Sequence, residues 1–218
     1  MSETDPSQTS VALESRRPDA GRLHSPSAGR NAAAIAAVLA EHLPEGAVVQ
    51  EIGSGTGEHA VAACAARADI TWRPSDPNAE SRLSQAAWAV EAGGRIAAPE
   101  MIDASDAAWA EGRPGFDALV CMNVIHISPF AVTEGLAAGA ASGLSANGLV
   151  YLYGPFQEGE NTAPSNLAFD RNLKARDPRW GVRARLDVER VFAVQGFSLA
   201  HRIEMPANNL SLVFRRTR

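Results

Sequence analysis

The sequence has few of the residues that build metal sites and disulfides. Its 218 residues include 2 cysteines and 5 histidines, and neither type recurs at the spacing of a zinc site. Cys64 and Cys121 each stand inside an apolar segment, where a free cysteine usually packs as a small hydrophobe. We therefore expect a reduced, cytoplasmic protein without a bound metal.

The chain also lacks a basic stripe, a secretory signal and a membrane-spanning run. The basic residues are nearly all arginines, they are scattered, and the formal net charge is −5, which disfavours DNA or RNA as a partner. Residues 1–24 are polar and acidic with no apolar core, so we expect a disordered tail there. With 45% hydrophobic residues, residues 25–218 can form one domain, and we expect a monomer or a homodimer with no membrane partner.

Helix and strand patterns alternate along the rest of the chain. Strands are predicted at 47–52, 70–75, 99–102 (weakly), 116–122, 149–153, 197–205 and 210–215. Helices are predicted at 31–43, with Asn31 as the cap, and at 57–68, 80–92, 129–144 (ending at Asn147-Gly148), 165–176 and 187–195. This alternation predicts an α/β fold with a doubly wound, mostly parallel seven-stranded sheet, Rossmann-like, and an antiparallel C-terminal hairpin joined by Pro206-Ala207-Asn208-Asn209.

The most informative motif is Glu51-Ile52-Gly53-Ser54-Gly55-Thr56-Gly57, where an apolar strand ends in an acid and breaks into alternating glycines. Glycines let the backbone turn sharply and approach a ligand, and the next helix offers unpaired N–H groups. The dinucleotide pattern G-x-G-x-x-G does not fit, because its third glycine would fall at Glu58. The pattern E-x-G-x-G-x-G resembles the first motif of class I S-adenosylmethionine (SAM) methyltransferases. A glycine-rich turn without a ligand is the alternative.

Polar residues follow the predicted strands, at the sheet edge where ligands of such folds bind. Asp76 comes about twenty residues after the glycine loop, where a carboxylate can accept hydrogen bonds from ribose hydroxyls; otherwise it is a turn residue. Asp103 would lie beside the adenine of SAM, or cap a short helix that begins at Ser105 or Asp106. Asn123 follows the fourth strand, and Tyr153 ends the fifth.

Several further motifs together resemble one protein family. They are Arg30-Asn31, Glu58-His59-Ala60, Pro74-Ser75-Asp76, Asn123-Val124-Ile125-His126, Tyr153-Gly154-Pro155-Phe156, 162–166, 176–181 and 205–211. The family is domain-of-unknown-function family 938, which includes the methyltransferase-like 26 group, and the resemblance covers about Ser25 to Arg216. It implies a class I SAM methyltransferase fold, with no established methyl acceptor. The fourth-strand motif departs from the Asn/Asp-Pro-Pro-aromatic pattern of amide and base methyltransferases, which disfavours such acceptors.

The predicted cofactor contacts come from the glycine motif and from residues around it. They are Arg30, Glu51, Gly53, Ser54, Gly55, Gly57, His59, Asp76, Asp103 and Asn123. The resemblance implies that the acid ending the first strand lies near the methionine end of SAM. Arg30 can bind a carboxylate of cofactor or acceptor bidentately, or form a surface salt bridge. His59, at the start of a helix, is either structural or in contact with the cofactor carboxylate.

His126 and Tyr153 are the predicted catalytic residues. The ordinary pKa of histidine is near neutrality, so His126 can serve as a general base, unless it only packs between Ile125 and Ile127. Tyr153 can donate a hydrogen bond to the acceptor or act as a phenolate base, although a tyrosine at a strand end often only packs.

The segment 154–181 is too long for a simple connection, and we expect it to form a lid over the acceptor. Phe156, Asn161, Asn166 and Asn208 are the predicted acceptor-binding residues. A surface excursion anchored by its aromatic residues is the alternative.

The function predicted from the sequence is methyl transfer from SAM to a small molecule, through an oxygen, nitrogen or sulfur atom that the sequence does not identify. No G-x-S-x-G motif for a serine nucleophile is present. A protein side-chain methyltransferase, or a SAM-binding scaffold without turnover, are the alternatives.

Overall fold

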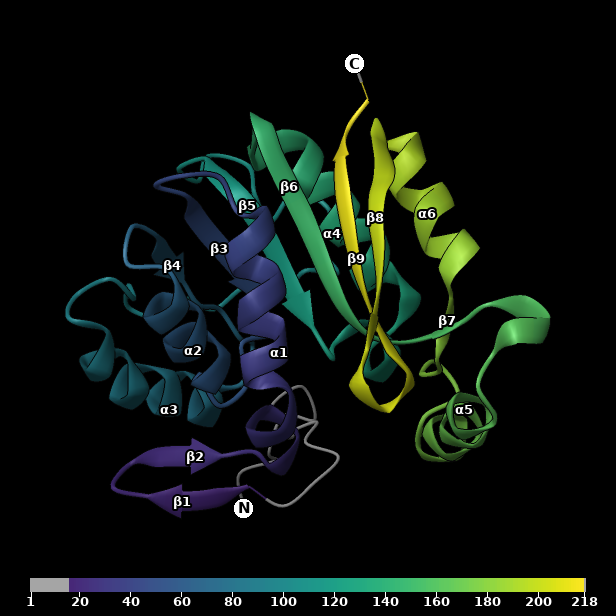
Figure 1. Ribbon diagram of the computed structural model, residues 1–218, viewed down its shortest axis with the longest axis horizontal. Helices are drawn as coiled ribbons and strands as arrows, with labels where there is room; N and C mark the ends of the chain where they lie inside the picture. Colours follow the sequence, from purple (N-terminus) through teal and green to yellow (C-terminus); the bar gives the residue numbers. More distant parts are fainter. Residues whose placement is uncertain (1–15, 218) are drawn as a thin grey trace, which may run out of the picture. The chain divides into compact units, whose positions relative to one another are not determined.

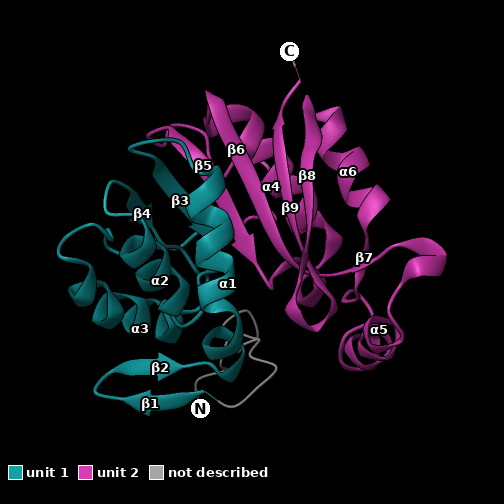
Figure 2. Ribbon diagram, in the orientation of Figure 1, with its two compact units in different colours: residues 1–102 teal, residues 103–218 magenta. Residues whose placement is uncertain are grey.

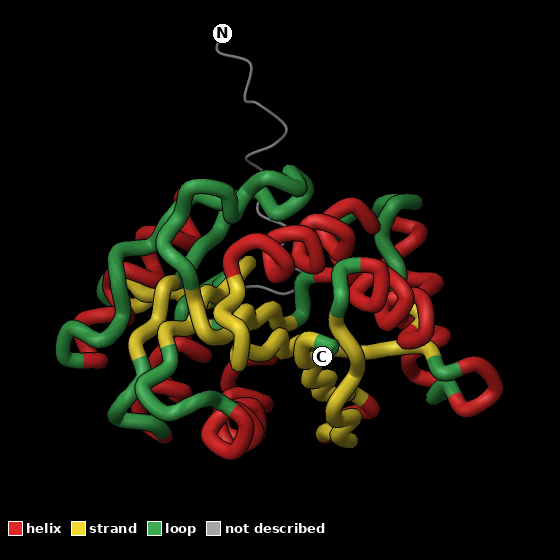
Figure 3. Tube along the Cα trace, turned by 90° about the horizontal axis from the view of Figure 1, so that it is seen from above, coloured by secondary structure: helices red, strands yellow, loops and turns green. Residues whose placement is uncertain are grey.

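The structure, a computed structural model, describes residues 16–217. The chain divides into two compact units, Met1–Ile102 and Asp103–Arg218 (Figure 2). In both, helices and strands follow one another along the chain and are joined by loops (Figure 3). Residues 1–15 of the expected tail lie outside the described residues.

The first unit begins with a hairpin and continues as alternating helices and strands (Figure 1). Its elements are β1 (Arg17–Asp19), β2 (Arg22–His24), α1 (Pro26–His42), β3 (Val48–Ile52), α2 (Glu58–Ala66), β4 (Thr71–Arg73), α3 (Ala79–Ala89) and the short 3-10 helix η2 (Val90–Ala92). The strands β1 and β2 pair antiparallel, whereas β3 and β4 pair in parallel. The glycine motif thus connects a parallel strand to a helix, as predicted.

The hairpin corrects the expectation that disorder extends to residue 24. Leu23 is buried, its backbone N donates to Ser84 Oγ at 2.8 Å, and its carbonyl accepts from Trp88 Nε1 at 3.1 Å. Both partners belong to α3, so β2 is held on that helix. Tertiary hydrogen bonds therefore order a segment whose polar composition alone indicated disorder.

The start of α1 also differs from the prediction. Ser25 is the cap, with its Oγ accepting from Ala28 N at 3.3 Å, and Pro26 occupies the first turn, where a missing N–H costs nothing. Asn31, the predicted cap, lies inside the helix and is buried. The apolar positions Ile35 and Leu39 are buried as expected.

The second unit contains the remaining helices and strands. They are β5 (Phe116–Met122), η3 (Ile125–Ile127), α4 (Phe130–Gly143), β6 (Leu144–Gln157), η4 (Gly159–Asn161), α5 (Pro164–Arg176), β7 (Arg183–Ala184), α6 (Arg185–Val194), β8 (Phe197–Met205), η5 (Pro206–Asn208) and β9 (Asn209–Arg216). The pairs β5–β6 and β6–β7 are parallel, and β9 lies antiparallel between β6 and β8. Leu119, Leu149 and Leu212 are fully buried in these strands.

The predicted α/β class, with parallel pairing and an antiparallel C-terminal pair, is confirmed. The strand predicted at 99–102 is wrong. Residues 99–102 form no named strand, and this part of the chain has only isolated bridges, Trp72 with Ile96 and Ser75 with Glu100. The helix predicted at 129–144 is confirmed as Phe130–Gly143, but Asn147-Gly148 does not end it, because β6 begins at Leu144, which is buried and pairs with Phe116. None of the described helices combines the length and the apolar character needed to cross a membrane.

Candidate functional site

The glycine loop between β3 and α2 has a backbone that only glycine adopts readily. Gly53, Gly55 and Gly57 have φ angles of 71°, 57° and 98°, all in the left-handed region. A Cβ on Gly57 would also lie 2.9 Å from the Cα of Gln85. Gly57 is therefore required by both backbone conformation and space.

The loop leads directly into the N-terminus of α2. Gly57 is the cap residue and makes no side-chain capping bond, and the first N–H groups of a helix have no partner within it. The side chain of Glu58 accepts from Ser25 N at 2.8 Å and from Thr56 Oγ1 at 2.7 Å. These bonds fix the start of α2 against the start of α1.

Ser54 and Ser75 hold the ends of β3 and β4 together. Ser54 N donates to Ser75 O at 2.8 Å, and Ser75 N donates to Ser54 Oγ at 3.0 Å. Ser75 Oγ donates to Glu51 O at 2.6 Å. Ser54 therefore positions the loop; its predicted contact with a cofactor stays a prediction.

Asp76 lies against the glycine loop. Its Oδ2 accepts from Gly55 N at 2.9 Å, and its Oδ1 accepts from Asn78 N at 2.9 Å. Burial raises the pKa of this carboxyl, whereas the two backbone N–H groups and the charges of Arg16 and Arg82 lower it. Asp76 is thus both a turn residue and a loop partner, and each of its oxygens can accept a further hydrogen bond.

Glu51, at the end of β3, is fully enclosed. Its Oε2 accepts from Trp72 Nε1 at 2.8 Å. Burial raises its pKa to about 7; hydrogen bonds from Ser54 and Trp72 lower it, and the charge of Asp76 raises it. The sequence analysis missed Trp72, whose position in a strand gives no sign of a polar role.

Glu51→Gln should raise the free energy of unfolding at pH 8 by about 1–3 kcal/mol and change it little at pH 4.5. Because the folded-state pKa lies above the unfolded value, the stability from protonated Glu51 is complete below pH 4.5 and is lost as the pH rises through about 7. Glutamine keeps an oxygen for Trp72 and carries no charge. Urea unfolding at both pH values measures the effect, with exposed Glu41→Gln as the control. An equal effect at both pH values would contradict it.

His59 and Arg30 also belong to the first unit. His59 stands in the first turn of α2, and its buried Nδ1 has no hydrogen-bond partner among the described residues. Burial lowers the pKa of His59 to about 4, so the imidazole is neutral at pH 7. Arg30 is exposed on α1. The cofactor contacts of both residues stay predictions.

In the second unit, Asn123 and His126 follow β5, and Tyr153 lies inside β6, the strand that pairs with β5, although the sequence predicted that this strand ends at Tyr153. Asn123 has a φ of 58° and donates its backbone N–H to Tyr153 O at 2.8 Å. His126 is buried, and its Nδ1 has no partner in the described part of the chain. Burial, and then the charge of Arg183, lower the pKa of His126 to about 3. The imidazole is therefore neutral at physiological pH.

Three residues of the segment 154–181 lie close to His126. A Cβ on Gly154 would lie 3.4 Å from His126 Nδ1 and 3.6 Å from Asn123 Oδ1. The ring of Phe169, on α5, meets the His126 ring edge-on at 5.6 Å between centroids, and Gly181 N donates to His126 O at 3.0 Å. This segment therefore packs on the predicted base.

Arg183 holds the backbone around His126 and was not found from the sequence. Its Nε donates to Ile125 O at 2.9 Å, and its Nη2 donates to Ser128 O at 2.5 Å. Both acceptors are backbone carbonyls that flank His126. The sequence gives no sign of this role, because Arg183 and the carbonyls that it binds are far apart along the chain.

The polar residues predicted to bind the acceptor attach α5 to the rest of its unit. Asn166 Nδ2 donates to Phe156 O at 3.2 Å and to Asn208 O at 2.9 Å. Asn208 Nδ2 in turn donates to Ser165 Oγ at 2.9 Å, so α5 lies beside the turn between β8 and β9 (Figure 1). Phe156, Asn166 and Asn208 are thus brought together, whereas Asn161 is exposed in η4. Their contacts with an acceptor stay predictions.

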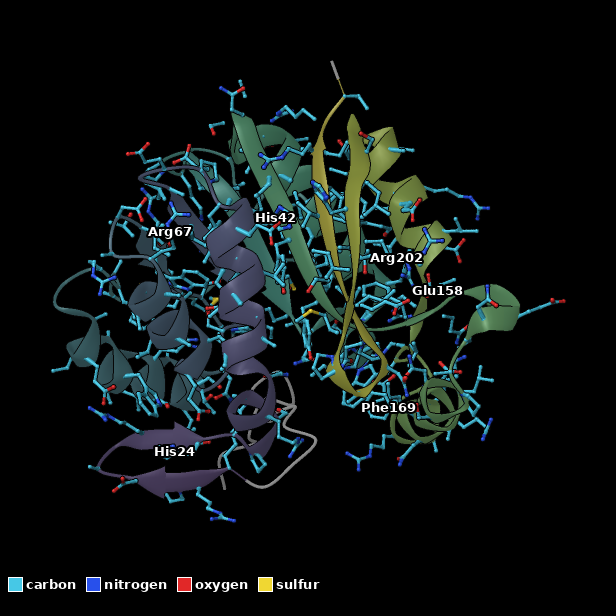
Figure 4. The ribbon with its side chains drawn as sticks, viewed as in Figure 1. His24, His42, Arg67, Glu158, Phe169 and Arg202 are labelled. Carbon is cyan, nitrogen blue, oxygen red and sulfur yellow. The ribbon has the colours of Figure 1, made fainter. Side chains whose placement is uncertain are left out.

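A cluster of charges fixes the beginning of the same segment. Glu158 accepts from Arg185 Nε at 2.9 Å and from Arg202 Nη2 at 2.6 Å, and Figure 4 shows Glu158 and Arg202 close together. The hydrogen bond from Arg202 is the main cause of the lowered pKa of Glu158. The carboxylate therefore ties the end of β6 to α6 and β8.

Asp103 is exposed and closes a turn. Its Oδ1 accepts from Ser105 N at 2.9 Å and from Ser105 Oγ at 2.7 Å. The following residues, 104–110, are turns and bends, so the short helix expected at Ser105 or Asp106 does not form. The contact of Asp103 with adenine stays a prediction.

Comparison with known families assigns the chain. The family described as "Protein of unknown function (DUF938)" matches residues 22–216. The chain belongs to the DUF938 family.

Solved structures with the same fold as this DUF938 chain include methyltransferases. CalO1, a methyltransferase in calicheamicin biosynthesis in its SAH-bound form, is 17% identical with a TM-score of 0.69, over 85% of this chain and 54% of that one. An O-methyltransferase family 2 protein from Planctomyces limnophilus DSM 3776, in complex with apigenin, is 18% identical with a TM-score of 0.73, over 88% and 60%. An O-methyltransferase family protein from Burkholderia thailandensis is 15% identical with a TM-score of 0.74, over 88% and 57%. The DUF938 chain thus spans little more than half the length of these proteins.

The DUF938 match contains every site residue predicted from the sequence. In the first unit, Ser75 binds both Ser54 and Glu51, Asp76 binds the loop at Gly55, and Arg30 is exposed. Within residues 16–217, no group of three or more His, Cys, Asp or Glu side chains could hold a metal ion.

Proposed function

We propose that this chain is a SAM-dependent methyltransferase that acts on a small molecule. The observation that carries the proposal is the pairing of a left-handed glycine loop with a buried carboxylate. Asp76 accepts from the backbone N–H of Gly55 at 2.9 Å, between a parallel strand and the open N-terminus of a helix. This arrangement offers a carboxylate for a ribose and backbone N–H groups for the other end of the same cofactor.

The residues present fit the cofactor. Gly53, Gly55 and Gly57 would hold its methionine end, where a side chain would occupy the space, and Asp76 would accept from its ribose hydroxyls. Gln85 donates from Nε2 to Gly55 O at 2.9 Å, while its buried Oε1 has no partner among the described residues. When bound, SAM would supply a methyl group on a sulfonium, whose transfer releases the neutral thioether SAH, an excellent leaving group. The task of the protein is then mainly to position the acceptor.

A small acceptor is supported by the second unit and by the names of the structural neighbours. The segment 154–181 packs on His126 through Phe169 and Gly181, as expected of a lid that excludes water. CalO1 is named for calicheamicin biosynthesis, and the Planctomyces protein was solved with apigenin. We therefore propose that Phe156, Asn161, Asn166 and Asn208 belong to the acceptor side, and that the acceptor is a metabolite.

A cytoplasmic location is part of the same proposal. Cys64 and Cys121 are both buried, and neither forms a disulfide within residues 16–217, as is usual for proteins of a reducing compartment.

Asp76→Ala should weaken the binding of S-adenosylhomocysteine (SAH) by about 1–3 kcal/mol, because hydrogen bonds to a charged group are lost. Titration calorimetry of the parent and the variant measures this effect. Asp106→Ala is the matched control. The exposed carboxylate of Asp106 accepts from Ala108 N at 2.9 Å, the same turn hydrogen bond that Asp76 accepts from Asn78 N. Unchanged affinity in Asp76→Ala would remove Asp76 from the site, and no SAH binding by the parent would overturn the proposed function.

The acceptor is identified by a mass-resolved screen of pooled metabolites with methyl-labelled SAM. We expect a labelled small molecule that disappears when the protein is omitted. If the label is found only in protein, the acceptor is a protein side chain and not a metabolite. If SAH binds but neither metabolites nor protein carry the label, the result favours a SAM-binding scaffold without turnover.

A further inference from the structure

The N-terminal hairpin places an arginine at the glycine loop. Arg16, directly before β1, donates from Nη1 to Ser81 Oγ at 2.9 Å. Its Nη2 lies 3.6 Å from the position that a Cβ on Gly55 would occupy, and its charge opposes the effect of burial on the pKa of Asp76. The guanidinium of Arg16 thus lies close to Gly55, and its charge acts on Asp76, which accepts a hydrogen bond from Gly55 N.

The position of Arg16 is fixed through α3. The same helix binds β2 through Ser84 and Trp88 and binds the loop through Ser84 Oγ to Thr56 O at 2.7 Å and Gln85 Nε2 to Gly55 O at 2.9 Å. His24 adds an edge-on contact with Trp88, at 5.0 Å between ring centroids; Figure 4 labels His24 on the hairpin. Hairpin and glycine loop therefore share one rigid support.

The second cation near Asp76 has a structural task, which sets it apart from Arg16. Arg82 Nη1 donates to the backbone carbonyls of Asp76 and Pro77 at 2.7 and 2.8 Å, and so stabilises the turn after β4. Arg16 acts on Asp76 through its charge and belongs to a segment outside this turn, which precedes the DUF938 match at residue 22. Its place beside the carboxylate is therefore not needed to form the turn.

We propose that Arg16 is a cofactor-binding residue that donates to a ribose oxygen of the bound adenosyl cofactor, so that the hairpin closes the ribose end of the site. A ribose hydroxyl that donates to Asp76 keeps lone pairs, and these can accept from the adjacent guanidinium, which carries five N–H donors. The carboxylate and the guanidinium would then bind the same diol from two sides. The inference rests on the proposed function and adds a residue and a segment to its site.

The test is calorimetric binding of SAH and of 5′-methylthioadenosine, which has the same ribose and lacks the amino acid carboxylate. Arg16→Ala should weaken the binding of both ligands by a similar factor of about ten or more, because each loses a hydrogen bond from a charged donor. Arg17→Ala, which removes the neighbouring exposed arginine of β1, is the matched control and should bind both ligands like the parent. Thermal unfolding without ligand should give the same midpoint for both variants.

The possible results separate this inference from the proposed function. If the parent binds SAH and Arg16→Ala binds it equally well, the inference is overturned and the proposed function stands. If Arg16→Ala weakens the binding of SAH but not that of 5′-methylthioadenosine, the ribose contact is overturned, because the guanidinium then contacts the amino acid carboxylate of SAH. If Arg17→Ala weakens both ligands as much as Arg16→Ala, the effect is one of general charge, and the inference fails. No SAH binding by the parent overturns both.

Discussion

Gly57→Ala should weaken SAH binding by about a hundredfold, which is about 3 kcal/mol. An alanine at a φ of 98° is strained, and its Cβ would lie 2.9 Å from the Cα of Gln85. Strain and collision of this kind each cost about 1–3 kcal/mol. The loop must then move, and with it the N–H groups at the start of α2 that the proposed cofactor site uses. Calorimetric titration with SAH measures the loss.

Gly93→Ala is the matched control for this prediction. Gly93 also has a left-handed φ, 59°, but a Cβ there meets nothing within 4 Å. The control should lose stability through backbone strain alone and keep its affinity for SAH. If Gly57→Ala, folded at the temperature of the titration, binds SAH as the parent does, the loop is not part of the cofactor site.

The features that sequence analysis predicted correctly are those with local causes. The bounds of β5 and β8 match the prediction, because a continuous apolar run and the Pro206–Asn208 turn are visible in a few neighbouring residues. The left-handed glycines of the loop were predictable for the same reason, since spacing and composition alone require them. The position of Asp76 beside the glycine loop followed from its distance along the chain, whereas its contact with a ribose stays a prediction.

What the sequence could not predict depends on contacts between distant residues. Trp72 donates to Glu51 across 21 positions, Arg16 to Ser81 across 65, and Asn166 to Asn208 across 42. Each of these side chains has an ordinary alternative role on a strand, in a tail or on a helix surface. Which role each side chain takes depends on the fold, because a buried polar group without a hydrogen-bond partner costs free energy and is therefore paired.

The packing role of the glycines in α4 also depends on distant residues. In the sequence, Gly135 and Gly139 only lower the helix propensity of their segment. In the structure a Cβ on Gly135 would lie 1.8 Å from Ala104 O, and one on Gly139 would lie 2.2 Å from the Trp109 ring, while Trp109 Nε1 donates to Gly135 O at 2.8 Å. These glycines allow α4 to approach the turns that follow Asp103, which no pattern within α4 indicates.

The burial of His126 changes what its proposed role as a base requires. With a pKa of about 3, the imidazole of His126 is neutral at any physiological pH, so one of its two ring nitrogens can accept a proton, but the ring holds that proton weakly. A base of this kind contributes at the lower end of the usual range of about 10²–10⁴-fold. The absence of a partner for Nδ1 among the described residues and the space beside Gly154 leave that atom available for an acceptor hydroxyl.

His126→Asn should therefore lower the rate of hydroxyl methylation by about a hundredfold and leave SAH affinity nearly unchanged. The sign of the pH dependence follows from the lowered pKa. An exposed histidine loses its basic form below about pH 6.5, whereas His126 keeps it down to about pH 3. Protonation of His126 should thus cause no fall in the parent rate between pH 8 and pH 5. Single-turnover rates against pH, measured with an identified hydroxyl acceptor, test both statements.

His201→Asn, on the exposed face of β8, is the matched control and should leave the rate unchanged. If His126→Asn methylates a hydroxyl at the parent rate with the parent pH profile, His126 only packs against Phe169. A parent rate that falls with a midpoint near pH 6.5, and a fall that His126→Asn abolishes, would instead show that ligand binding restores the ordinary pKa of His126. An unprotonated amine or a thiolate needs no base, so for such an acceptor the same substitution should change the rate little while the Gly57→Ala effect on SAH binding persists.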